Sequence, residues 1–581
     1  MKRSSAWSLA AALVAACSSV SPAVKDEDAG AHGAADTPSV TPDAPGASAS
    51  DADTQGGDTP GAGADGGGTE PPPCEAPGVT SPAWYHEAVG YEIFVRSFQD
   101  SDGDGIGDLA GLTSRLDYLN DGDPTTDTDL GVTLLWLMPI NQSPSYHGYD
   151  VTDYRAIEED YGSLEDLDAL LAAAHQRGIR VIMDLVLNHS SSQHPWFKDA
   201  AAGPGAPLRD HYVWSEVFLD WDRPWGPGPT WVKAGASWYY ALFWEGMPDL
   251  NFTSAAVRAE MTDVARFWLS RGVDGFRLDA ARYLVETGPG PGQADTPETH
   301  AFWRDLRAMM DSEAPGSMTV GEVWEQTSVV VPYYGTAASP ELHMLFDFDG
   351  ASGALQAVSQ GKEAALRTRL CKRLREYPPD AAVGTFLTNH DQARVATELG
   401  DEASLRLAAA LLLGLPGTPW LYYGEEIGMK SGPGGGDEPK RLPMQWGPGG
   451  FSTGTPWKAP ASTEAAASVA GQTNDPGSLL SWYRRLIRER QALPALSRGA
   501  TKHIGATGSV GAPLVVLRSH GDQAALLVYS FASVPQVITV APPLPATTFT
   551  DRLTGATLSR VDASAPLEVS LPARGFALLV P

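Results

Sequence analysis

Short apolar runs alternate with amphipathic stretches along the chain from about residue 84 onward. Runs of four or five residues rich in Val, Ile, Leu, Phe and Trp predict buried strands. We assign eight of them, at residues 91–95, 133–137, 181–185, 275–278, 319–323, 345–348, 383–387 and 420–423. Most are separated by helical patterns, such as 164–176, 255–270 and 405–415. Strands alternating with helices predict an α/β fold, a closed (β/α)8 TIM barrel.

Two regions depart from this alternation. The gap after the third strand is too long for one helix, and residues 190–252 are rich in Trp, Tyr, Pro and Gly. We expect an inserted B subdomain there. After a helix at 482–490, residues 497–581 alternate Val, Leu and Thr with turns, which predicts a C-terminal antiparallel β-sandwich, domain C. The barrel, domain A, is then expected over 83–189 and 253–496.

The N-terminal region has the features of an export signal. Lys2 and Arg3 precede a short apolar run that ends in LVAAC at residues 13–17. This resembles the bacterial lipobox, in which the leader is removed and the cysteine is acylated. We expect residues 1–17 to be a lipoprotein signal peptide with a lipidated Cys17, and Ser18 to direct the protein to the outer membrane. An ordinary signal peptide with an incidental cysteine is the alternative.

Residues 18–82 are mainly Ala, Gly, Asp, Pro, Ser and Thr, which cannot bury enough apolar surface to repay ordering. We expect a disordered acidic linker, so that the lipid is the only membrane anchor. The chain has 41 basic and 71 acidic residues, a net charge of −30, which disfavours nucleic acid but not a neutral polysaccharide. Export permits a disulfide between Cys74 and Cys371. Two free thiols fit the sequence equally well.

Polar side chains gather where four of the predicted strands end. A lone Asp at such a place commonly caps the next helix. Four such segments in order indicate the catalytic face of a barrel. They are 183–189 (MDLVLNH), 275–279 (GFRLD), 321–324 (GEVW) and 386–391 (FLTNHD).

These segments resemble the signature regions of glycoside hydrolase family 13, the α-amylase family. The resemblance covers about residues 84–581 and includes 131–139 (GVTLLWLMP), 247–251 (MPDLN) and 443–446 (PMQW). The MPDLN form is similar to members intermediate between oligo-1,6-glucosidases and neopullulanases. The resemblance implies a retaining hydrolase acting on α-glucan polysaccharides or oligosaccharides. We expect a monomer.

Cleavage with retention requires two carboxyl groups about 5–5.5 Å apart. Asp279 and Glu322 end adjacent strands, so we expect Asp279 to be the nucleophile and Glu322 the acid/base, its pKa raised by burial and nearby carboxylates. Arg277 faces the same way as Asp279 and would keep it ionised. By resemblance, Asp391 is the third catalytic carboxylate and Asp184 binds Arg277. The other residues expected to bind substrate are Tyr149, His189, His390 and Arg441.

One departure from the family pattern bears on substrate mode. Exo-acting α-glucosidases of this family carry an Asp three positions before the residue matching Tyr149, and it grips the non-reducing end together with an Arg. Here that position is Tyr146, whereas Arg441 is present. We therefore expect endo-action on α-1,4-glucans: starch, glycogen and maltooligosaccharides. The alternatives are a glucosyltransferase, a trehalose-synthase-like isomerase, an exo-α-glucosidase, or a non-catalytic glycan-binding lipoprotein.

An acidic loop follows the first predicted strand. Asp100, Asp102, Asp104 and Asp108, with the carbonyl of Ile106, alternate as oxygen ligands of Ca²⁺ do. An EF-hand is excluded because Gly111 occupies its twelfth position. Family members resembling oligo-1,6-glucosidase carry Ca²⁺ in this loop, so we expect one structural Ca²⁺. A solvated acidic turn is the alternative.

Overall fold

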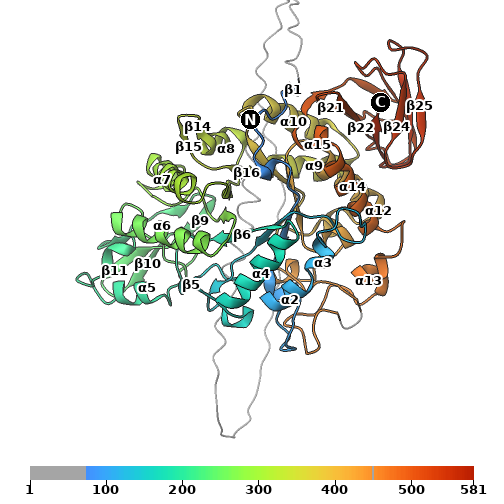
Figure 1. Cartoon of the computed structure of the whole chain (residues 1–581). Coiled ribbons are helices and arrows are strands. Elements are labelled where there is room, and N and C mark those ends of the chain that lie inside the picture. The colour runs from blue at the N-terminus through green and yellow to red at the C-terminus, as the bar shows by residue number, and fades with distance from the viewer. Residues whose placement is uncertain (1–73, 448–449) are drawn as a thin grey trace, which may run out of the picture. The chain divides into compact units, whose positions relative to one another are not determined.

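The computed structural model describes residues 74–447 and 450–581, and within them eight parallel strands close into a barrel (Figure 1). The predicted (β/α)8 barrel is confirmed, and each of the eight predicted runs overlaps one barrel strand. Around the barrel these strands are β2 (Gly90–Ile93), β3 (Leu134–Leu137), β6 (Arg180–Leu185), β12 (Gly275–Leu278), β13 (Met318–Gly321), β16 (Met344–Phe346), β17 (Ala382–Phe386) and β18 (Thr418–Tyr422).

Four of the longer barrel helices begin at a residue whose side chain caps the helix. Ser163, Asp347, Asp401 and Ser478 accept a backbone N–H at the starts of α4, α9, α12 and α14. The helices of this domain are α2 (Leu109–Ser114), α3 (Leu116–Leu119), α4 (Leu164–Gln176), α6 (Ala255–Ser270), α7 (Pro297–Glu313), α8 (Thr327–Val330), α9 (Phe348–Gln360), α10 (Ala364–Glu376), α11 (Val395–Leu399), α12 (Glu402–Gly414), α13 (Val469–Gln472), α14 (Leu479–Ala492) and α15 (Pro494–Arg498).

The apolar helix α12 is explained by its surroundings. Its residues from Leu407 to Gly414 are buried, and it packs beside α14 and α9. Tyr529 of the C-terminal region donates a hydrogen bond to the carbonyl of Ala410, so α12 has a neighbour on that side too. Within the described residues, no helix combines the length and apolar character that a membrane span needs.

The segment between β6 and α6 forms small antiparallel sheets. The strands β10, β11 and β7 pair in that order, and β8 pairs with β9. The elements here are α5 (Pro195–Ala200), β7 (Trp214–Ser215), β8 (Asp222–Arg223), β9 (Gly226–Pro229), β10 (Trp231–Ala234) and β11 (Ser237–Tyr240). Two other short pairs occur in the barrel's loops, β4 (Asn141–Gln142) with β5 (Asp153–Ile157) and β14 (Gly335–Thr336) with β15 (Ser339–Pro340).

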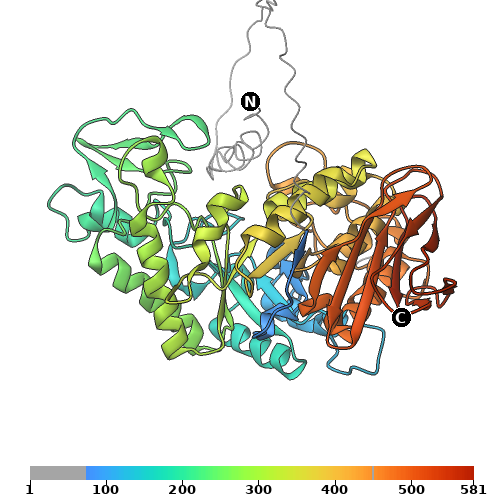
Figure 2. The same cartoon turned by 90° about the horizontal axis from the view of Figure 1, so that it is seen from above.

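The C-terminal region consists of antiparallel sheets beside the second half of the barrel (red in Figure 2). One, which begins with β1 (Glu75–Ala76), has the order β1-β19-β21-β22-β27-β24-β25, and the other has the order β20-β23-β26. Their facing sides share an apolar core that includes Val515, Leu526, Ile538 and Val569. The strands are β19 (Ala500–His503), β20 (Ala506–Gly508), β21 (Leu514–His520), β22 (Gln523–Tyr529), β23 (Gln536–Val540), β24 (Thr548–Asp551), β25 (Thr557–Ser559), β26 (Leu567–Leu571) and β27 (Phe576–Val580).

Residues 74–82, expected to belong to the disordered linker, are described by the structure. Strand β1 (Glu75–Ala76) pairs with β19, and Cys74 forms a disulfide with Cys371 of α10. A covalent bond and a strand partner fix this segment, and neither is visible in its composition. The predicted lipid attachment at Cys17 lies outside the described residues.

Candidate active site

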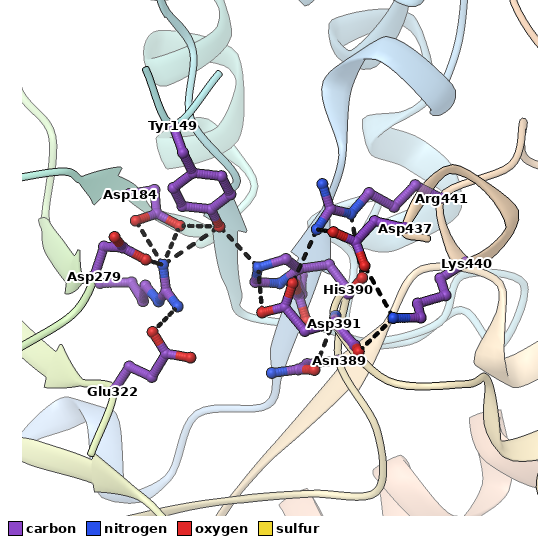
Figure 3. Close-up of polar contacts among 12 residues, drawn as sticks. Tyr149, Asp184, Asp279, Glu322, Asn389, His390, Asp391, Asp437, Lys440 and Arg441 are labelled. Carbon is purple, nitrogen blue, oxygen red and sulfur yellow. Dashed lines mark hydrogen bonds and ion pairs between the residues drawn. The ribbon is translucent and has the colours of Figure 1, made fainter. Parts of the chain in front are cut away.

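Arg277 is the centre of a buried group of carboxylates at the carboxyl ends of β6, β12 and β13. Figure 3 labels these carboxylates, Asp184, Asp279 and Glu322. Nη1 of Arg277 donates to Asp184 at 2.8 Å and to Asp279 at 2.7 Å, and Nη2 donates to Glu322 at 2.6 Å. One guanidinium therefore holds both carboxyl groups that the sequence singles out, on adjacent nitrogens. Ala280, which follows Asp279, has a φ of 49°, a conformation that costs energy for a residue with a side chain.

The carboxyl group of Glu322 is suited to carry a proton near neutral pH. Burial raises its pKa, Arg277 opposes this, and the charges of Asp279 and Asp391 raise it further, to about 7. Oε2 accepts from Arg277, whereas Oε1 is buried and receives no hydrogen bond from the residues that the structure describes. A proton on this group would therefore be carried on Oε1.

A second group of charges follows β17. Nε2 of His390 lies 3.1 Å from Asp391 Oδ2 and 2.8 Å from the hydroxyl of Tyr149. The same hydroxyl donates to Asp184, so Tyr149 links this group to the carboxylates around Arg277. Burial alone would raise the pKa of Asp391, but the charges of His390 and Arg441 lower it well below its usual range. Asp391 is therefore ionised at any working pH.

Arg441 closes this side of the site. Its Nη2 lies 2.9 Å from Asp391 and 3.2 Å from Asp437, and its guanidinium carbon lies 5.9 Å from the ring centre of Tyr146. Lys440 binds Asp437 at 2.9 Å and also donates to the carbonyl of Asp391. The two cations and two carboxylates fix the loop that carries Asp391 (Figure 3).

His189 lies at the edge of the group rather than within it. Its Nε2 is 3.1 Å from the carbonyl of Tyr149, and its ring packs edge-on against Phe243. The preceding Asn188 donates to Asp249 of the MPDLN segment at 2.7 Å. The structure thus joins the end of β6 to the inserted segment through side chains from both.

The predicted metal loop is partly assembled. Carboxylate oxygens of Asp100, Asp102 and Asp108 lie within 4.8 Å of one another, and among the described residues Asp104 is not part of that group. Asp104 accepts the N–H of Ile106 instead. Asp100 accepts the N–H groups of Gly103 and Gly105, so these bonds pre-form the turn. Three hard oxygen donors at this separation fit Ca²⁺.

Two polar residues of the site were not predicted. Glu92 lies 2.5 Å from His390 Nδ1, and Asp437 binds Arg441. The signal for Glu92 is a single carboxylate inside the apolar strand GYEI. Asp437 follows a glycine-rich loop that has no periodicity to interpret. The residues that were predicted as catalytic or substrate-binding lie in the group around Arg277, in the group that follows β17, or at the edge of these groups.

Known proteins resemble this chain in sequence and in structure. The family model described as "Alpha amylase, catalytic domain" matches residues 92–499. "Alpha-amylase 3" of Dictyoglomus thermophilum is 40% identical over 429 residues, which is 72% of this chain and 80% of that protein. "Trehalose synthase/amylase TreS" of Mycolicibacterium smegmatis is 35% identical over 523 residues, 79% of this chain and 86% of that one.

The solved structure of an α-amylase from H.orenii matches with a TM-score of 0.74 and 38% identity, covering 85% of this chain and 99% of that chain. The barrel, the carboxylates at its strand ends and these similarities all indicate the same family. The protein is a glycoside hydrolase and belongs to the α-amylase family, glycoside hydrolase family 13.

Proposed function

We propose that this protein is an endo-acting, retaining α-amylase that cleaves α-1,4-glucosidic bonds in starch, glycogen and maltooligosaccharides. The observation that carries the proposal is the pairing of Asp279 and Glu322 on adjacent nitrogens of Arg277, with ionised Asp391 connected to them through Tyr149. Relatives are named Alpha-amylase 3 and Oligo-1,6-glucosidase, and these names support this substrate class.

In the first step of the proposed reaction, a carboxylate oxygen of Asp279 attacks the anomeric carbon. The bond from that carbon to the leaving oxygen breaks, and Oε1 of Glu322 gives its proton to this oxygen. In the second step, Glu322 takes a proton from water, and the resulting hydroxide displaces Asp279 from the anomeric carbon. Two inversions at the carbon leave its configuration unchanged.

The remaining site residues have supporting roles in this proposal. Arg277 binds and orients the carboxylate of Asp279, and Asp184 binds and orients Arg277. Asp391 would hold hydroxyl groups of the sugar ring while positive charge develops at the anomeric carbon. His189 and His390 would bind the same sugar, and Tyr149 would stack on its face. Arg441 fixes Asp391 from the opposite side.

Endo-action is supported by the aromatic side chains next to Arg441. There Tyr146 stacks on Trp457, with ring centres 5.5 Å apart, and contacts the guanidinium of Arg441. An aromatic pair offers a surface for a further glucose unit, whereas a carboxylate at position 146 would clamp a chain end. The test is a time course of products from starch, pullulan, cyclodextrin and maltose. Glucose as the sole early product from starch would contradict endo-action.

Transfer to a sugar acceptor is the second candidate, because relatives are named trehalose synthase/amylase and trehalose synthase. A sugar hydroxyl would then replace water in the second step, with the same residues in the same roles. Trehalose formed from maltose would favour this reaction, whereas maltose and longer oligosaccharides formed from starch favour hydrolysis.

We also propose one structural Ca²⁺ in the loop of residues 100–108 and a lipid at Cys17 that holds the protein on the outer membrane. Asp100, Asp102 and Asp108 would bind the ion. Metabolic labelling with palmitate, compared between the natural chain and Cys17→Ser, tests the lipid. Label on the Cys17→Ser chain would contradict the attachment.

A further inference from the structure

Glu92 is a buried carboxylate that has no role in the proposed two-step reaction. It lies on β2, is 3% exposed, and its Oε1 is 2.5 Å from Nδ1 of His390, which is 1% exposed. We propose that Glu92 is a positioning residue that fixes His390 as a doubly protonated imidazolium. Nε2 of His390 is thereby held as a hydrogen-bond donor toward Asp391 and the bound sugar. The proposal rests on the reaction of the family and not on endo-action.

The geometry around the imidazole favours two protons on the ring. Nδ1 faces Glu92 at 2.5 Å, and Nε2 faces Asp391 at 3.1 Å and the hydroxyl of Tyr149 at 2.8 Å. Because that hydroxyl donates its proton to Asp184, it accepts from Nε2. A neutral imidazole has one N–H and one lone pair, so either tautomer would point a lone pair at a carboxylate. The imidazolium donates to both carboxylates and has no such conflict.

The surroundings of His390 agree with a charged ring. Burial lowers the pKa of His390, but the charges of Asp391 and Glu92 outweigh this and raise it to about 10. Other titratable and charged side chains lie near His390. They are the phenol of Tyr149, the carboxyl groups of Asp184 and Glu322, and the guanidinium groups of Arg277 and Arg441.

The position of Glu92 is fixed by the barrel itself. Its backbone pairs with Trp136 of β3 and Tyr422 of β18, so the strand aims the carboxyl group at His390. Asp391 is in turn held between two cations, His390 on Oδ2 and Arg441 on Oδ1. Without the negative charge of Glu92, the imidazolium of His390 would lose a proton more easily. Asp391 would then keep only Arg441 as a cationic partner among these two.

The variant Glu92→Gln tests this arrangement, because glutamine keeps the shape and can still accept from Nδ1. The rate of nitrophenol release from 4-nitrophenyl α-maltotrioside reports the first step, whether water or a sugar completes the reaction. We expect kcat/KM at pH 6 to stay within about threefold of the unaltered enzyme and to fall more than about tenfold below it at pH 8.5. A ratio that is the same at every pH would overturn the proposal.

Glu426→Gln is the matched control. Glu426 is fully buried and accepts hydrogen bonds from Tyr91, the neighbour of Glu92, and from Tyr118. It undergoes the same substitution of a buried carboxyl group without contact to His390. We expect its ratio to the unaltered enzyme to be independent of pH. A pH-dependent loss equal to that of Glu92→Gln would show that burial of a charge, and not the contact with His390, causes the effect.

A double-mutant cycle with His390→Asn separates positioning from a general structural role. If Glu92 acts through His390, Glu92→Gln changes kcat/KM by less than about twofold in the His390→Asn background. An undiminished effect would overturn the proposal.

Should Glu92→Gln fail to fold, ¹⁵N-histidine NMR of the unaltered enzyme still tests the proposal. Two ring N–H signals of His390 are expected at pH 8, and a single one would overturn it. Neither readout depends on the products formed from starch.

Discussion

Arg277 and Glu322 form a buried ion pair in which Nη2 and Oε2 are 2.6 Å apart. The pair leaves Oε1 of Glu322 to carry the proton that the leaving oxygen needs. Because burial and the neighbouring carboxylates raise the pKa of Glu322 to about 7, the acid form is populated below that pH and lost above it. We therefore expect kcat/KM to fall above about pH 7.

Replacement of Glu322 tests its role as the general acid. Glu322→Gln should lower kcat on starch by about 10²–10⁴-fold, the usual contribution of a general acid. With α-maltosyl fluoride, whose leaving group needs no proton, the first step should keep most of its rate. Equal losses on both substrates would contradict the assigned role.

Asp279→Asn should abolish hydrolysis, because the amide cannot form the ester and is a poor nucleophile. We expect kcat to fall by at least about 10⁴-fold while binding of maltooligosaccharides persists. Asp274→Asn is the matched control at the opposite end of β12. Asp274 binds His175 and Arg180, so its loss should lower thermal stability and leave kcat within about twofold. Hydrolysis that survives Asp279→Asn would remove the proposed nucleophile.

Tyr146 tests the mode of attack on the polymer. Tyr146→Asp places a carboxylate beside Arg441 and removes the ring that stacks on Trp457. We expect early products from starch to shift toward glucose, and KM for long chains to rise. Tyr146→Phe keeps the ring and should keep the product pattern. An unchanged pattern in Tyr146→Asp would mean that this position does not set the mode.

The proposed Ca²⁺ predicts a loss of stability on chelation. At a free Ca²⁺ concentration a hundredfold above the dissociation constant, the ion contributes about 2.7 kcal/mol to unfolding, so Tm should drop on addition of EDTA. Asp102→Asn should remove that response. Asp123→Asn, in another acidic turn, should keep it, because Asp123 lies outside the group of three carboxylates. No change in Tm or in metal content on chelation would refute the site.

The sequence predicted the barrel and most of the site for a physical reason. Strands buried on both faces give continuous apolar runs, and polar residues directly after such runs must meet at one end of the barrel. Asp279 and Glu322 come directly after β12 and β13, and Asp391 lies in the loop that follows β17. Glu92 escaped prediction because its role depends on barrel closure, which brings β2 beside β18 and Glu92 to His390. The bond from Cys74 to Cys371 spans 297 residues and leaves no local pattern.

That disulfide determines how the enzyme bears a mechanical load. When the chain is pulled from its two ends, the residues between Cys74 and Cys371 lie inside a covalently closed loop and cannot be extended. This loop contains Glu92, Tyr149, Asp279 and Glu322. A force applied at Cys74 would pass through the disulfide to α10 and spare the strands that carry Asp279 and Glu322. Among the described residues, those after Cys371 remain open to extension, and they include His390, Asp391 and Arg441.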